Sequence, residues 1–327
     1  MRILHISFHM GCHNEITYII EKLGHQLSFL SFNDGTKGKY NIGYDRAERY
    51  WNKHCNYFNK FDLVITSDTA PISRIFLQNG WTKPLIIWIN NRFDYADQAT
   101  NDCNFPDDNY YELFKKATTQ KNVRIIGYTP FENYYCKHIR NIDIGTDIIK
   151  PIGNISDVYN SNNRTKLENK NNIVLVGPYH NDNIMMNLAE KLKELNISVY
   201  SGRFYGPLDL AEFKCVVHIP YAWSNYSLFE GIQCGIQYLI PSKDFLFNLI
   251  KDKNFFWSPP FRPEVLKLSE WYCEENKNII IYFNSWEDLK IKLYTTNFEK
   301  RKLLLKEFGL EHKNKMIHLW EKCFNSF

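Results

Sequence analysis

Residues His218–Ser242, HIPYAWSNYSLFEGIQCGIQYLIPS, contain the signals of one complete repeat of an α/β fold. The apolar run Cys215–Ile219 predicts a buried strand that ends at the start of this stretch. Small polar residues then precede a helical pattern over Leu228–Cys234, which ends at Gly235, as helices commonly do. A second short run, Gln237–Ile240, predicts the next strand. Strand, helix and strand in this order indicate a parallel β-α-β unit.

The same alternation continues on both sides of this stretch. Apolar runs predict further strands at Ile173–Val176 and Ile197–Tyr200. Helical spacing predicts helices over Ile184–Leu195, Leu208–Phe213 and Asp244–Ile250. After Pro259-Pro260 we expect a mainly helical tail, with helices over Pro263–Trp271, Ser285–Tyr294 and Phe298–Phe324.

The first half of the chain repeats the pattern. Its expected strands are short and largely apolar, at Arg2–Phe8, Gln26–Phe32, Asp62–Thr66, Leu85–Ile89 and Val123–Ile126. Helical spacing separates them, at Glu15–Leu23, Tyr44–Asn59, Ile72–Gln78, Tyr110–Ala117 and Phe131–His138. Short apolar strands that alternate with helices are typical of a parallel sheet covered on both faces.

Two such halves indicate two domains, because single hydrophobic cores stop growing at about 250–300 residues and this chain has 327. The polar, turn-rich stretch 151–172 is predicted to be the interdomain linker. The predicted fold is therefore α/β, with two Rossmann-like doubly wound domains facing a central cleft. We place the first domain at 1–150, the second at 173–305 and a final amphipathic helix at 306–327. Ligands of such sheets bind beyond the carboxyl ends of the strands.

Over Asp209–Ser242 the sequence resembles the C-terminal domain of glycosyltransferases of the GT-B fold. The family pattern is a proline after a strand, a loop of small polar residues, an acidic residue on the next helix, a glycine and a proline-terminated strand. These features lie at Pro220, Ser224-Asn225-Tyr226-Ser227, Glu230, Gly235 and Pro241. The resemblance implies a nucleotide-sugar donor on the second domain, an acceptor on the first, and a last helix that often crosses back onto the first.

The donor-binding residues implied by the resemblance surround a predicted helix N-terminus. Such an end presents unpaired N–H groups and a positive dipole, which suit a pyrophosphate, and Ser224 and Ser227 can add hydroxyl donors. Glu230, one turn further on, would accept hydrogen bonds from ribose hydroxyls, whereas an isolated helical glutamate is usually a solvated residue. The implied set is Pro220, Ser224, Tyr226, Ser227, Leu228 and Glu230.

Residues after neighbouring strands extend this candidate donor site. Gly177 would let the backbone approach the ligand, and Tyr179 would stack on a base. Arg203 would pair with a phosphate through its planar guanidinium, and Lys243 is a weaker candidate of the same kind. Ordinary turns and surface side chains explain the same residues, so both interpretations stay open.

The first domain offers groups for the acceptor and for proton transfer. In the resembled family, the loop after the first strand often carries a glycine close to the donor, and Gly11 fits it. An inverting transfer needs a carboxylate or an imidazole to take the proton of the acceptor hydroxyl. The favoured catalytic candidates are Glu15 and Asp94, with His13 beside them. Acceptor contacts are predicted at Asp68, Asn91 and Arg92. A structural role, such as an ion pair between Arg92 and Asp94, is the alternative.

Composition and spacing disfavour several other classes. The net charge of +4 is small and the basic residues are scattered, so no nucleic-acid footprint is expected. Eight cysteines without a C-x-x-C pair, and the lack of a D-x-D sequence, give no support for a metal site. A missing G-x-G-x-x-G disfavours a dinucleotide oxidoreductase. Without a signal peptide or an apolar span, we expect a cytoplasmic protein with reduced cysteines.

The sequence therefore predicts a metal-independent transferase without a cofactor. It would move a sugar from a nucleoside-diphosphate donor to a hydroxyl of a glycan or glycoconjugate. Many retaining members of the resembled family carry a second glutamate eight positions before Glu230, where this chain has Ala222, and this difference favours inversion. The alternatives are a nucleotide-sugar epimerase on the same fold and a non-catalytic glycan- or nucleotide-binding module.

Overall fold

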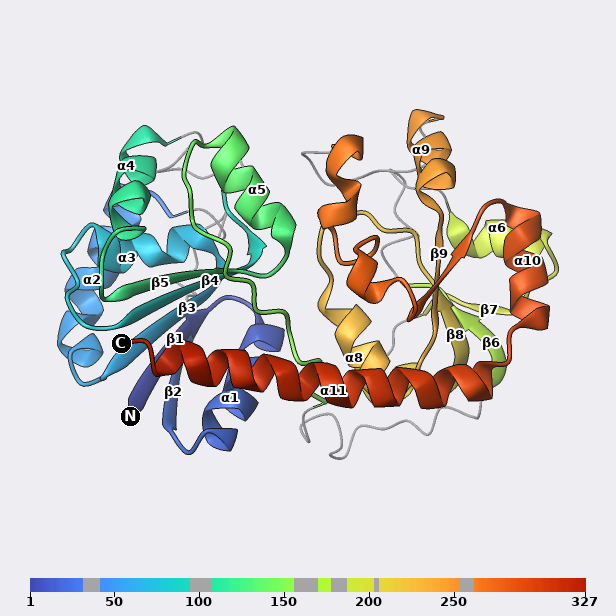
Figure 1. The fold of residues 1–327 in the computed structure, drawn as a ribbon, viewed down its shortest axis with the longest axis horizontal. Coiled ribbons are helices and arrows are strands. Elements are labelled where there is room, and N and C mark those ends of the chain that lie inside the picture. The colour runs from blue at the N-terminus through green and yellow to red at the C-terminus, as the bar shows by residue number, and fades with distance from the viewer. Residues whose placement is uncertain (32–41, 95–106, 156–169, 178–186, 203–205, 253–261) are drawn as a thin grey trace. The chain divides into compact units, whose positions relative to one another are not determined.

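The computed structural model describes residues 1–31, 42–94, 107–155, 170–177, 187–202, 206–252 and 262–327. The chain divides into two compact units. The N-terminal unit comprises Met1–Pro151 with Lys315–Phe327, and the C-terminal unit comprises Ile152–Asn314. Each contains a five-stranded parallel sheet with helices between its strands (Figure 1). The prediction of two doubly wound, Rossmann-like α/β domains is confirmed.

The N-terminal sheet has the strand order β2-β1-β3-β4-β5. Its strands are β1 (Arg2–Ser7), β2 (Gln26–Ser31), β3 (Leu63–Thr69), β4 (Leu85–Arg92) and β5 (Val123–Gly127). The helices are α1 (Met10–Lys22), α2 (Tyr44–Phe58), α3 (Arg74–Leu77), α4 (Asp108–Ala117) and α5 (Pro130–Ile139), and a 3-10 turn, η1 (Ala70–Ser73), precedes α3. The strand order reverses between β1 and β3, which is where ligands of such sheets bind.

The C-terminal sheet has the order β10-β9-β8-β6-β7. Its strands are β6 (Lys170–Leu175), β7 (Val199–Tyr200), β8 (Phe213–Val217), β9 (Tyr238–Pro241) and β10 (Ile280–Phe283). The helices are α6 (Leu188–Glu194), α7 (Pro207–Leu210), α8 (Tyr226–Cys234), α9 (Lys243–Lys251), α10 (Trp286–Thr295) and α11 (Phe298–Phe324), with 3-10 turns η4 (Pro263–Leu268) and η5 (Glu274–Asn276). Counted within the unit, this is the same order as in the N-terminal sheet, with its switch point between β6 and β8.

Helix α11 contributes residues to both units, since the chain returns to the N-terminal unit at Lys315. There Trp320 packs edge-on against Trp88 of β4, with ring centroids 5.3 Å apart. Both rings are fully buried, and the indole N–H of Trp88 donates to the carbonyl of Ile149 at 2.9 Å. The end of α11 is therefore part of the N-terminal core.

The tail of the chain is less helical than predicted. Ile280–Phe283 forms β10, which pairs in parallel with β9 and completes the C-terminal sheet. A helix is predicted over Pro263–Trp271, but the chain forms the short 3-10 turn η4 there and ends it at Leu268. The apolar run that contains β10, Ile279–Phe283, is short, so its period alone does not separate a strand from a helix.

Both ends of the segment predicted to be a linker lie within the described residues. Pro151, Ile152 and Gly153 are buried, and residues 170–172 are the first residues of β6. Gly153 has a φ of +70°, and a Cβ atom at this position would lie 2.3 Å from the carbonyl oxygen of Phe229 in α8. Only glycine fits a positive φ and so close a backbone approach at once. Pro151 therefore belongs to the N-terminal unit, and Ile152 and Gly153 are packing residues of the C-terminal unit.

Candidate functional sites in the two units

Helix α8 begins at the carboxyl edge of the C-terminal sheet, where the sequence predicts an anion site. Asn225 is its N-cap, and its Oδ1 accepts the backbone N–H of Ser227 at 2.9 Å and the Ser227 hydroxyl at 2.6 Å. The buried carboxylate of Glu270 accepts the backbone N–H of Asn225. A glutamate in the first turn of a helix makes the same bond in a capping box. Here a distant segment supplies it.

These bonds change the roles predicted for this end of α8. Two backbone N–H groups and the Ser227 hydroxyl already donate to side chains of the protein, so a bound phosphate must use other groups. The positive end of the helix dipole remains, because it arises from the whole first turn. The side chain of Leu228 is 1% exposed and belongs to the core. The Ser227 hydroxyl therefore bonds to Asn225 in this structure, and Leu228 can contact a ligand only through its backbone.

Glu230 lies one turn into α8 and is half-buried. Burial raises the pKa of the Cys234 thiol to about 12, and the Glu230 charge adds to this increase. Burial also raises the pKa of Tyr238, again with a contribution from Glu230. The Tyr238 hydroxyl donates to the carbonyl of Ser227 at 2.9 Å, which ties β9 to the first turn of α8. Glu230 is therefore a partly accessible carboxylate on a well-supported helix.

The other predicted donor contacts come from the two strands at the switch point. Pro220 is buried in the segment after β8, and Ser224 and Tyr226 are half-buried near the start of α8. Gly177 follows β6, which pairs directly with β8. Gly177 and Pro220 therefore lie in segments that leave neighbouring strands at the same edge of the sheet. Tyr179 and Arg203 lie outside the described residues.

In the N-terminal unit, two histidines stack beside the switch point. His5 of β1 is fully buried, and its Nε2 lies 2.7 Å from the Ser67 hydroxyl of β3. His13 of α1 stacks on Phe29 of β2 with ring centroids 3.8 Å apart, and on His5 at 6.3 Å. Burial, and then the neighbouring His13, lower the pKa of His5 to about 3. Burial lowers the pKa of the half-buried His13 as well. Both imidazoles are therefore neutral at pH 7.

The carboxyl ends of β3 and β4 are joined by a polar network. Asp68 has a φ of +83°, uncommon for a residue with a side chain, and the strand register shifts between it and Thr69. Its backbone N–H donates to Asn90 Oδ1 at 2.5 Å, and Asn90 Nδ2 donates to Cys12 Sγ at 2.9 Å. Such backbone conformations cluster at functional sites. Asp68 is thus held at the edge that the sequence predicts, although its side chain is 1% exposed.

Two further predicted residues lie on α1. The backbone N–H of Gly11 donates to Nδ1 of the N-cap residue, His9, at 3.0 Å. Glu15 is 2% exposed and faces the core. Gly11 therefore lies in the first turn of α1 and not in a loop, while Glu15 is a buried carboxylate and not a solvent-facing one.

The buried carboxylate of Asp94 is the centre of a group of hydrogen bonds and an ion pair, the Asp94 centre. Its carboxylate accepts the hydroxyls of Tyr111 at 2.5 Å and Tyr135 at 2.7 Å, and it pairs with Arg140 Nε at 2.5 Å. Burial, and then Asp94, raise the pKa of both tyrosines, so their hydroxyls stay protonated. Burial alone would lower the pKa of Arg140, but Asp94 raises it above the usual value. A fully buried carboxylate with three donors is not placed to take a proton from an acceptor. Among the described side chains, Asp94 forms its ion pair with Arg140; the side chain of Arg92, its predicted partner, lies outside the described residues.

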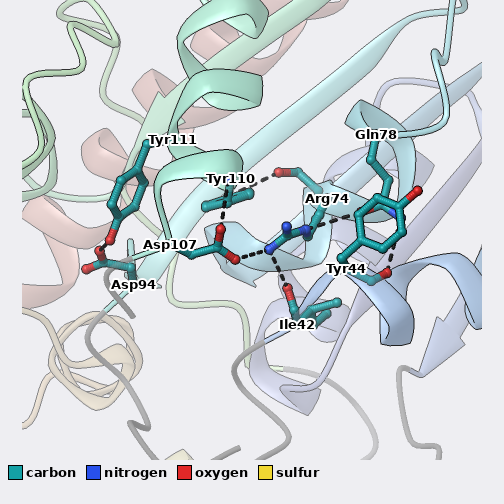
Figure 2. A network of polar contacts seen from close by, with 9 residues as sticks. Ile42, Tyr44, Arg74, Gln78, Asp94, Asp107, Tyr110 and Tyr111 are labelled. Carbon is teal, nitrogen blue, oxygen red and sulfur yellow. Dashed lines mark hydrogen bonds and ion pairs between the residues drawn. The ribbon is translucent and has the colours of Figure 1, made fainter. Parts of the chain in front are cut away.

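A second buried charge lies beside this centre (Figure 2). Arg74 is 2% exposed and pairs with Asp107, which also caps α4 by accepting the backbone N–H of Tyr110 at 3.1 Å. Arg74 Nε donates to Gln78 at 3.2 Å, and its guanidinium lies 5.6 Å from the centre of the Tyr110 ring. This pair fastens α3 to α4. The side chains of the predicted acceptor residues Asn91 and Arg92, at the end of β4, lie outside the described residues.

The sequence reasoning missed Glu270, Asn90 and Arg140. Asn90 could have been found, since it stands at the carboxyl end of a predicted strand, directly before Asn91. Glu270 and Arg140 carry no local signal, because each meets its partner across 45 or more positions of chain. In the part of the chain that the structure describes, no group of three His, Cys, Asp or Glu residues is arranged to hold a metal ion. No helix among these residues is long and apolar enough to cross a membrane.

No protein-family model matches the chain, and no curated protein matches it. Among solved structures, it resembles the glycosyltransferase SnogD from Streptomyces nogalater, with 11% identity, a TM-score of 0.48, and coverage of 98% of this chain and 99% of that one. It resembles UGT89C1 of Arabidopsis thaliana complexed with UDP, with 13% identity, a TM-score of 0.46, and coverage of 98% and 94%. It also resembles a UDP-GlcNAc 2-epimerase from Methanocaldococcus jannaschii, with 11% identity, a TM-score of 0.47, and coverage of 92% and 94%.

Solved glycosyltransferases thus resemble the chain over nearly its whole length, as the sequence pattern indicated. An epimerase does so equally well. At these identities and TM-scores the likeness does not decide an activity, so function has to be inferred from the residues of the chain itself.

Proposed function

We propose that the protein transfers a sugar from a nucleoside-diphosphate donor to a hydroxyl of a glycan or glycoconjugate. The donor binds the C-terminal unit at the switch point between β6 and β8, and the acceptor binds the N-terminal unit. The observation that carries the proposal is Glu230, a half-buried carboxylate one turn beyond the capped N-terminus of α8. A carboxylate in this position is suited to accept hydrogen bonds from the two ribose hydroxyls.

The diphosphate would bind at the start of α8 through groups other than the Asn225 and Ser227 N–H groups and the Ser227 hydroxyl, which are already hydrogen-bonded. Asn225 and Glu270 hold the loop, so the first turn is ordered before the donor arrives. Preorganised dipoles stabilise developing charge without reorganisation, which favours departure of the nucleoside diphosphate without a metal ion. Gly177, at the end of the neighbouring strand, leaves room for the donor next to the backbone.

Of the three catalytic candidates, His13 suits proton transfer best. Asp94 is satisfied by Arg140 and two tyrosines, and Glu15 faces the core. His13 is half-buried beside the N-terminal switch point, and its lowered pKa keeps it neutral and able to accept a proton at pH 7. We assign it the role of general base towards the acceptor hydroxyl, and an inverting transfer.

Binding is tested first, by thermal unfolding with UDP, GDP, CMP, ADP and their sugars, with and without Mg²⁺. A ligand at a hundredfold excess over its Kd stabilises the native state by about 2.7 kcal/mol. We expect one nucleoside diphosphate to raise the unfolding temperature. Glu230→Ala should weaken that ligand about 10- to 100-fold, the usual effect of losing a hydrogen bond to a charged group. Glu287→Ala, on the exposed first turn of α10, is the control and should bind normally.

Turnover is tested with the nucleotide sugar that binds. We expect slow release of the nucleoside diphosphate by hydrolysis, and His13→Gln to reduce it while leaving donor affinity unchanged. Conversion of the donor to its epimer would assign the alternative activity instead. The absence of a shift with every nucleotide would remove the donor site and the proposal with it.

A further inference from the structure

A cavity of about 360 Å³ lies at the carboxyl end of β9, within the C-terminal unit. Its lining includes Ser242 and Lys243 at the start of α9, Tyr282 of β10, and Tyr272, Glu274 and Lys277 from the chain between η4 and β10. Small-ligand sites usually measure about 300–1,000 Å³ and have mainly apolar walls with a few polar groups. This cavity has that size, and its lining combines two tyrosine rings with polar and charged side chains. Of its residues, only Lys243 is among the donor contacts considered in the sequence analysis, as a weaker candidate for a phosphate.

The chain from Ser269 to Lys277 connects this cavity to the start of α8. Glu270 accepts the backbone N–H of Asn225, and two residues later the Tyr272 hydroxyl donates to the carbonyl of Pro241 at 2.8 Å. Strands β8 and β9 are direct neighbours, and paired strands lie about 4.8 Å apart. The cavity and the start of α8 thus follow neighbouring strands, β9 and β8, at the same edge of the sheet. The next group of a ligand whose diphosphate binds at the start of α8, its sugar, can reach the cavity.

Two fixed tyrosines form the apolar wall of the cavity. The rings of Tyr272 and Tyr282 stack with centroids 5.8 Å apart and planes 24° apart. The Tyr282 hydroxyl donates to the carbonyl of Trp271 at 2.8 Å, so the polar tips of both residues are bonded. Burial raises the pKa of both tyrosines, which therefore stay neutral. A rigid aromatic wall of this kind suits the apolar face of a sugar ring.

The cavity lining contains two lysines and one glutamate, so one lysine has no anionic partner within the lining. Lys277 pairs with Glu274 at 3.3 Å, and both are well exposed. Within the described residues, Lys243 makes no ion pair and no side-chain hydrogen bond, and it is exposed at the mouth of the cavity. It also stands in the first turn of α9, where the helix dipole adds positive potential. The cavity therefore presents a net positive charge to a ligand.

We propose that this cavity is the subsite for the transferred sugar and selects a sugar that carries a carboxylate, with Lys243 as the specificity-determining residue. The inference rests on the proposed donor site and names the class of its sugar, a uronate. A neutral hexose would leave Lys243 without an anionic partner. A uronate would give it a charge-assisted hydrogen bond, which is roughly twice as strong as a neutral one.

The test compares donors that differ only in this carboxylate. Binding of UDP, UDP-glucose, UDP-glucuronate, GDP, GDP-mannose and GDP-mannuronate is measured by calorimetry on the unmodified protein, Lys243→Gln and Lys251→Gln. Lys251, in the last turn of the same helix, is the matched control because its loss changes the net charge equally. In one of the two series we expect the uronate to bind about tenfold or more tightly than the neutral sugar. Lys243→Gln should abolish that preference, and Lys251→Gln should keep it.

Each other outcome contradicts the inference in a recognisable way. Equal binding of uronate and neutral sugar by the unmodified protein overturns it, while UDP or GDP binding leaves the proposed donor site intact. If Lys243→Gln weakens the bare nucleotide as much as the uronate, Lys243 contacts the diphosphate and not the sugar. If both lysine variants lose the preference, the effect is one of overall charge. If neither series binds, the inference fails, and the wider nucleotide panel decides whether the donor site fails with it.

Discussion

The two sheets share one strand order, but their carboxyl edges are built differently. In the N-terminal unit, polar groups at or near this edge bond mainly to one another, as in the Asp94 centre and the His5–Ser67 contact. In the C-terminal unit, Glu270 and Asn225 bond to backbone N–H groups at the start of α8, and Glu230 one turn further on is half-buried. Equal topology therefore does not give equal chemistry. The buried network around Asp94 contributes rigidity, whereas the start of α8 is where we propose that the donor binds.

Removing the carboxylate at the centre of the buried network should have the largest effect. Asp94→Ala leaves the Arg140 charge and two tyrosine hydroxyls without their acceptor, and breaking a buried pair typically costs about 3–5 kcal/mol. Urea unfolding measures the loss. Glu112→Ala breaks an exposed pair with Lys115 and should unfold at the urea concentration of the unmodified protein. A loss of stability below about 1 kcal/mol for Asp94→Ala would mean that Arg140 and the two tyrosines reach water or other partners when the carboxylate is removed.

The support behind α8 can be tested at Gly153. Gly153→Ala combines a positive φ with contact against the α8 backbone, whereas Gly145→Ala has a positive φ with no atom within 4 Å. The strained φ alone costs about 1 kcal/mol, and the close contact should add about 1–3 kcal/mol at Gly153. Comparing the two free energies of unfolding isolates the contact. Equal losses would show that α8 does not depend on this segment.

Because His5 is buried in its neutral form, we expect the stability of the N-terminal unit to fall at acid pH. The pKa of His5 is about 3 in the folded protein, against an ordinary value of 6.5, so the unfolded chain binds the proton more readily. Stability from this group is complete above pH 6.5 and falls as the pH is lowered towards 3. The loss is about 2 kcal/mol between pH 7 and pH 5.

His5→Gln should flatten this pH dependence, measured by urea unfolding at a series of pH values. His138→Gln, at an exposed position on α5, is the control and should keep the original profile. A His5→Gln profile as steep as that of the unmodified protein would show that another group titrates.

The N-cap of α8 should have the smallest effect on stability and the most selective effect on binding. Asn225→Ala and Asn187→Ala each remove an N-cap bond, from α8 and α6, and each should cost about 1 kcal/mol. Only Asn225→Ala should also weaken nucleotide binding, because it loosens the proposed phosphate-binding turn. Calorimetry with the nucleotide that binds in the thermal-unfolding panel measures the affinity of each variant and so separates the effect on binding from the effect on stability. Equal nucleotide affinity in both variants would remove α8 from the donor site.

The sequence by itself determined the fold class, nine of the ten strands in the two sheets and the position of α8. These follow from local patterns: apolar runs, helical spacing, Gly235 after the helix and Pro241 at the end of β9. It also placed Gly11, Asp68 and Glu230 at the edges where ligands of such sheets bind. Strand β10 was missed because its short apolar run lies between segments with helical spacing, and a short run alone does not separate a strand from a helix.

Only the tertiary structure decided which polar residues are bonded to one another. Asp94 is locally a carboxylate after a strand, and nothing near it in the sequence shows that Arg140 and two tyrosines enclose it. The Glu270 bond to Asn225, the Gly153 contact with α8 and the cavity beside Lys243 likewise join distant segments. Hydrogen bonds and ion pairs depend on angstrom-scale distances between such segments. Hydrophobic patterning fixes which face of an element is buried, but it does not fix those distances.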